Sequence, residues 1–179
     1  MSYKKWVFIA IVLFGIGLAC GLTTPTSIIS LFYEDITVLQ ELIVPFNFLT
    51  VILIFLKNAS ALLLSFALSP ILCLMPILAL ILNGWLIAFI SVVVIQVESL
   101  SFVLAGLIPH GIFELPAFIL GEAAALSFGA MIIITLFKKE KRNLLLPSLK
   151  QNFRYLMIAL VLLVPAAIIE VYITPLLLT

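Results

Sequence analysis

Residues 102–137 read FVLAGLIPHGIFELPAFILGEAAALSFGAMIIITLF, a long apolar run that contains the only histidine of the chain. His110 is followed four residues later by Glu114, and Pro109 and Pro116 flank the pair. A titratable group in such an apolar setting is costly unless it has a partner or a task. This stretch is therefore the first candidate both for an irregular backbone and for a functional site.

The prolines and Gly111 predict a break in the helix. Proline lacks a backbone N–H and crowds the preceding turn, and glycine tolerates unusual dihedral angles. Residues 102–108 are too few to cross a bilayer, whereas 112–137 are enough. We therefore expect a re-entrant half helix over 102–111 around His110, a break at Pro109, Gly111 and Pro116, and then a full span.

The composition predicts a membrane protein. Hydrophobic residues make up 65% of the 179 residues, charged residues 9%, and the mean hydropathy is +1.42. Apolar runs of about 18 residues or more are typical of helices that span a bilayer, whereas β-barrels show short alternating segments. We expect an all-α, polytopic helical protein with a single transmembrane domain over 1–179 and about five spans, at 6–22, 45–68, 71–96, 112–137 and 155–173.

The charges predict an orientation in the cell membrane. Lys4, Lys5 and a basic loop over 138–154 hold eight of the nine basic residues. Basic residues favour the cytoplasmic side, so both regions are expected there. Five crossings then place the N-terminus in the cytoplasm and the C-terminus outside. The acidic residues between the predicted spans are expected outside as well: Glu34, Asp35, Glu41 and Glu98.

Small side chains recur every four residues in the fourth predicted span. Residues at this spacing lie on one face of a helix, and small residues let a neighbouring helix approach closely. We expect close helix packing along Ala117, Gly121, Ala125 and Gly129.

Polar side chains at membrane depth are expected to form a buried cluster. In a helical turn His110 and Glu114 lie on one face, and Glu170 in the last span could reach them. These three could hold a proton or a divalent metal, although a metal is not favoured, since one histidine cannot make a His-Glu-x-x-His motif. Glu122 could line the same space or, preferably, pair with Lys57. The expected cluster comprises Asn58, Asn83, His110, Glu114, Glu122 and Glu170.

The chain resembles the stage II sporulation protein M family of integral membrane proteins. The resemblance rests on PHGIFELP at 109–116, GEAAALSFG at 121–129, Asn58, NG at 83–84 and IEVYITP at 169–175. It implies a multi-pass protein without established enzymatic activity. In sporulating relatives, it implies a role in engulfment within a complex that remodels septal peptidoglycan.

Three functions are compatible with these features. The favoured one is a non-catalytic component that assembles in the lipid bilayer with envelope proteins or with copies of itself. The second is a small transporter or ion-binding protein that uses His110, Glu114 and Glu170. The third is an intramembrane metal-dependent hydrolase. No motif for nucleotide or nucleic-acid binding is present, and no nucleic-acid partner is expected.

Overall fold

The computed structural model describes residues 3–27 and 45–178, and these are helical without a strand. Five helices are long and apolar enough to cross a membrane, which confirms the all-α polytopic fold. Glu34, Asp35 and Glu41 lie outside the described residues. The elements are α1 (Tyr3–Thr23), α3 (Phe48–Leu68), α4 (Leu74–Val97), α5 (Leu100–Phe137), the 3-10 helix η2 (Lys139–Leu144), α6 (Leu145–Tyr172) and α7 (Thr174–Leu177).

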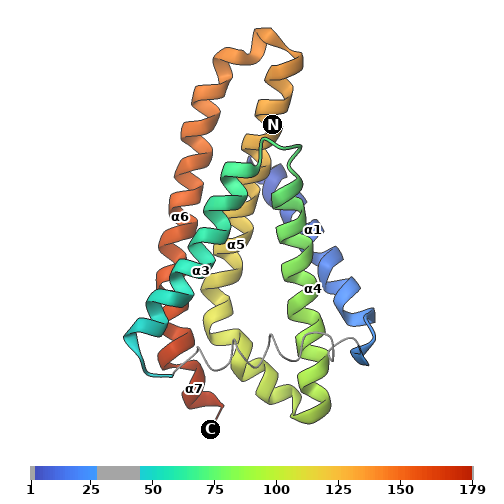
Figure 1. The fold of residues 1–179 in the computed structure, drawn as a ribbon, viewed down its shortest axis with the longest axis vertical. Coiled ribbons are helices and arrows are strands. Elements are labelled where there is room, and N and C mark those ends of the chain that lie inside the picture. The colour runs from blue at the N-terminus through green and yellow to red at the C-terminus, as the bar shows by residue number, and fades with distance from the viewer. Residues whose placement is uncertain (1–2, 28–44, 179) are drawn as a thin grey trace.

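The helices form a bundle in which sequence neighbours run in opposite directions (Figure 1). α5 and α6 make the longest pair and extend past the turn between α3 and α4 (Figure 1). At about 1.5 Å per residue, the 38 residues of α5 measure roughly 57 Å, well beyond a hydrocarbon core of about 30 Å. The α5–η2–α6 hairpin, residues 130–150, is therefore expected to leave the hydrocarbon region.

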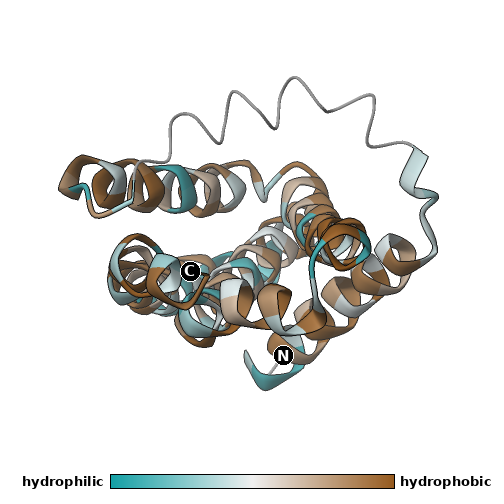
Figure 2. Cartoon of the chain, turned by 90° about the horizontal axis from the view of Figure 1, so that it is seen from below, coloured by the Kyte–Doolittle hydropathy of each residue, from teal (hydrophilic) through white to brown (hydrophobic). Residues whose placement is uncertain are grey.

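The surface of the bundle is apolar. Hydrophobic colour dominates the helices when they are viewed along the bundle (Figure 2). Phe8, Leu72 and Val161 are 66%, 75% and 65% exposed. A soluble protein rarely shows so much apolar surface, whereas lipid tails solvate it without penalty. The chain is therefore a multi-pass membrane protein.

The predicted re-entrant half helix over 102–111 is wrong, because α5 is one continuous helix from Leu100 to Phe137. Pro109 and Pro116 lie inside it, and its lower part is inclined to its upper part (Figure 1). Each proline removes one helical hydrogen bond, but the other backbone groups still need partners that lipid cannot supply. The chain therefore bends instead of breaking.

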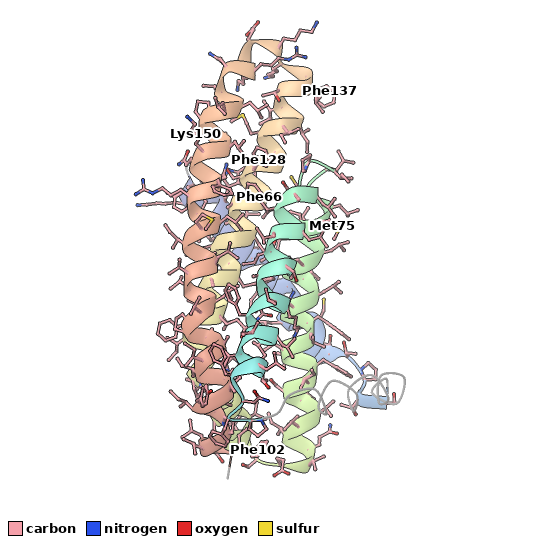
Figure 3. The ribbon with its side chains drawn as sticks, turned by 60° about the vertical axis from the view of Figure 1, so that its left-hand side comes forward. Phe66, Met75, Phe102, Phe128, Phe137 and Lys150 are labelled. Carbon is pink, nitrogen blue, oxygen red and sulfur yellow. The ribbon has the colours of Figure 1, made fainter. Side chains whose placement is uncertain are left out.

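The basic segment 138–154 is also more ordered than the predicted loop. It comprises η2 and the first turns of α6, which begins at Leu145 and not near residue 155. Nitrogen atoms crowd this end of the molecule, near the labelled Phe137 and Lys150, while Phe102 lies at the other end (Figure 3).

The small residues of α5 are buried between helices. Ala117 and Ala125 are fully buried. A methyl group on Gly121 would come within 2.9 Å of Leu62 Cδ2, and one on Gly129 would overlap the Ser69 carbonyl oxygen. On the adjacent face, the ring of Phe128 stacks on that of Phe66 of α3 at 5.0 Å (Figure 3).

A second close contact joins α1 to α4. A Cβ atom on Gly17 would overlap the carbonyl oxygen of Ile81, and one on Gly84 would overlap that of Phe14. We call this contact the α1–α4 seam. Its backbones touch because glycine leaves no side chain between them.

Candidate functional site

A cavity of about 550 Å³ lies between α3, α4 and α5, with contributions from α1 and α6. Its volume is in the range of small-molecule sites. Most of its wall is apolar, but seven polar side chains from four helices also line it: Lys57, Asn58, Asn83, Ser91, His110, Glu114 and Glu170. Five of these belong to the polar cluster expected from the sequence.

The contribution of α5 follows from helical periodicity. Phe102, Gly106, His110, Glu114 and Phe118 recur every four residues, and all five line the cavity. The stripe covers the proline-containing part of α5, which is the inclined part of the helix (Figure 1). The sequence signal that suggested a break therefore marks the bent wall of a cavity.

Glu114 has two polar neighbours. Its Oε1 accepts a hydrogen bond of 3.1 Å from the amide nitrogen of Asn58. Its Oε2 lies 3.7 Å from Nε2 of His110, one helical turn earlier. The side chains of His110 and Glu114 are 15% and 30% exposed, and the buried Nδ1 of His110 has no hydrogen-bond partner among the described residues. The pair is thus anchored to α3 through a single amide.

Glu170 reaches the cavity from α6. It is close enough to Lys57 and Glu114 for their charges to act on its carboxyl group. Within the described part of the chain, however, it makes neither an ion pair nor a hydrogen bond. Its oxygens therefore remain available as acceptors at the cavity.

Glu122 does not line this cavity. It is fully buried on α5, about two helical turns after Glu114. Its Oε2 accepts a 2.5 Å hydrogen bond from Ser65 of α3. Its Oε1 is buried without a partner among the described residues. The preferred pairing with Lys57 is therefore wrong, since the hydroxyl of Ser65 takes the place expected for that lysine.

The described side chains that could bind a metal do not form a metal centre. Within residues 3–27 and 45–178, no three His, Cys, Asp or Glu side chains come close enough to hold a metal ion. His110, Glu114 and Glu170 line one cavity without forming such a group. We therefore derive no chemistry from a bound metal.

Several lining residues escaped the sequence analysis. Ser91 follows Asn83 by eight residues, two helical turns, so polar spacing in α4 could have identified it. Phe14, Phe102 and Phe118 also line the cavity. Among 14 phenylalanines, nothing in the sequence distinguishes these three.

Comparison with known proteins identifies a family and a relative but no matching solved structure. A model of the family described as stage II sporulation protein M matches residues 7–175. A protein of Methanocaldococcus jannaschii described as uncharacterized is 33% identical over 97 residues, which are 54% of this chain. The chain spans about half the length of that curated relative, 54%, and no solved structure matches. Since the family model covers nearly the whole chain and five helices can cross a membrane, this multi-pass membrane protein belongs to the stage II sporulation protein M family.

Proposed function

We propose that this protein binds a small solute in its intramembrane cavity and carries it across the membrane. The observation that carries the proposal is the convergence of seven polar side chains from four helices on one cavity of about 550 Å³. Ionisable groups inside a membrane are costly and commonly mark the path of a substrate or ion. A scaffold would need neither the volume nor unpaired acceptors such as Glu170.

The positions of the basic residues support one orientation of the protein in the membrane. The ring of Tyr3 stacks on that of Tyr155 at 3.5 Å, so Lys4 and Lys5 lie near the level of Arg154. Both basic regions thus lie toward one end of the bundle, which we assign to the cytoplasm. The C-terminus lies toward the opposite end (Figure 1), the proposed outer side.

A hydrated cavity can be tested without knowing the solute. In a Cys20→Ala background, Asn83→Cys should react in membrane vesicles with a charged, water-soluble methanethiosulfonate, and adding Ala61→Trp should slow this reaction. Val161→Cys is the matched control, because Val161 is 65% exposed on α6 but does not line the cavity. Labelling is read by mass spectrometry of the intact protein. Equal, slow labelling at both positions would contradict an aqueous cavity.

The α5–η2–α6 hairpin favours a second function, assembly with envelope proteins. Phe137 is 84% exposed at its tip, beside basic residues of η2. In sporulating relatives such assembly corresponds to the engulfment complex that the family resemblance implies. Phe137→Ser should then lower the native mass of the complex solubilised from its own membrane, whereas Val97→Ser, at an equally exposed site, should not. A wild-type protein that migrates as a single chain would contradict assembly.

A further inference from the structure

We infer that the ligand of the cavity is an organic cation with an apolar body. This inference rests on the proposed function, since it names the class of solute that the cavity takes. Three features of the described residues support it: the balance of charge, the direction of the amide hydrogen bonds, and the aromatic wall.

The charged groups of the cavity leave an excess of negative charge. Its lining has one lysine, Lys57, and two glutamates, Glu114 and Glu170, so the formal charge is −1 with both glutamates ionised and His110 neutral. Glu170 makes no ion pair with another described residue. In a site walled by apolar side chains, such an excess favours a cationic ligand and disfavours an anionic one.

Asn58 and Asn83 each use an amide N–H within the protein, while acceptor oxygens at the cavity have no partner among the described residues. The amide nitrogen of Asn58 donates to Glu114, and that of Asn83 donates over 2.8 Å to the carbonyl of Ala79 in its own helix. The carboxyl group of Glu170 and the side-chain oxygen of Asn83 are left without a partner in the described residues. A ligand that supplies N–H donors or a positive charge would complete them.

The apolar wall contains three phenylalanines: Phe14, Phe102 and Phe118. Aromatic faces attract organic cations, especially in sites removed from water. An inorganic ion would leave most of the 550 Å³ unfilled, and no group of three metal donors exists among the described residues. An ammonium group would pair with the carboxylates, and the hydrophobic body attached to it would pack against the aromatic rings.

The test is binding of benzylammonium, the protonated form of benzylamine at neutral pH, to the purified full chain in neutral-detergent micelles, measured by calorimetry. Benzylsulfonate, which carries a negative head on the same benzyl body, is the matched probe. We expect saturable binding of the ammonium and none of the sulfonate. Glu170→Gln should weaken binding about tenfold or more, because it removes a charge-assisted contact while making no hydrogen bond that the fold needs. Glu140→Gln, on η2, should leave binding unchanged, and Ala61→Trp should abolish it by filling the cavity.

Each other outcome overturns the inference in a distinguishable way. Sulfonate binding that Ala61→Trp abolishes would reject the cationic class but keep a solute-binding cavity. Ammonium binding that survives Ala61→Trp and Glu170→Gln would be partition into detergent and would reject the site. Absence of binding by both probes would reject this class of ligand, and labelling of Asn83→Cys would then decide separately whether the cavity is hydrated.

Discussion

The two faces of α4 are built in opposite ways. Toward α1, Gly84 lets the backbones touch, and no space remains for a methyl group. Toward α3 and α5, Asn83, Ile87 and Ser91 face a cavity large enough for a small molecule. In a bilayer, where lipid tails are as apolar as the side chains, helices associate through close packing and hydrogen bonds. The α1–α4 seam therefore secures the helix whose other face can remain loosely packed.

The largest expected effect is on the α1–α4 seam. Gly17→Ala places a Cβ atom onto the carbonyl oxygen of Ile81, so the helices must separate. We expect a loss of at least about 1–3 kcal/mol in the free energy of unfolding, as for overpacked cores. Gly15→Ala is the matched control in the same helix, because no atom of the described residues lies within 4 Å of its added Cβ. Unfolding in mixed micelles measures both, and equal midpoints would refute a close-packed seam.

A smaller effect on stability is expected at Ser65 of α3, which belongs neither to the α1–α4 seam nor to the cavity lining. Ser65→Ala removes the 2.5 Å hydrogen bond to Glu122 and leaves a buried carboxyl group without its partner. We expect about 1–2 kcal/mol of destabilisation, in the lower part of the range for a buried group that loses its partner. In the part of the chain that the structure describes, the exposed hydroxyl of Ser60 bonds only to the Lys57 carbonyl of its own helix, so Ser60→Ala should change stability by less than about 0.5 kcal/mol. If thermal unfolding shows no difference between them, the buried pair does not hold α3 against α5.

The cavity itself should contribute least to stability. Asn58→Ala breaks a partly buried hydrogen bond to Glu114, which is worth about 0.5–1.5 kcal/mol. Asn83→Ala should cost less, since Asn83 is exposed and, among the described residues, bonds only within α4. Both variants should elute as folded protein in size-exclusion chromatography. Unfolding of either would mean that the polar lining is a structural lock and not a binding surface.

The sequence predicted the all-α fold with five membrane-length helices, because hydropathy alone identifies such helices, but it began the fourth and fifth spans at 112 and 155, whereas α5 and α6 begin at Leu100 and Leu145. Its expected cluster also included five of the seven polar residues at the cavity, since polar groups in an apolar run are conspicuous. It failed at Pro109 and Pro116, where the need to satisfy the remaining backbone groups outweighed the effect of two missing donors. It also misplaced Glu122, because the choice between Lys57 and Ser65 depends on how α3 and α5 are rotated against each other. Local pattern does not determine that rotation.

The α1–α4 seam also has a consequence for synthesis. Gly17 and its contact Ile81 are separated by 64 positions (81 − 17), and α3 is made between them. At ~5–20 residues per second, α1 waits on the order of several seconds before its principal partner among the described helices exists. During that interval its glycine face must remain among lipids or be held by the insertion machinery. α1 is thus made well before the helix against which it mainly packs.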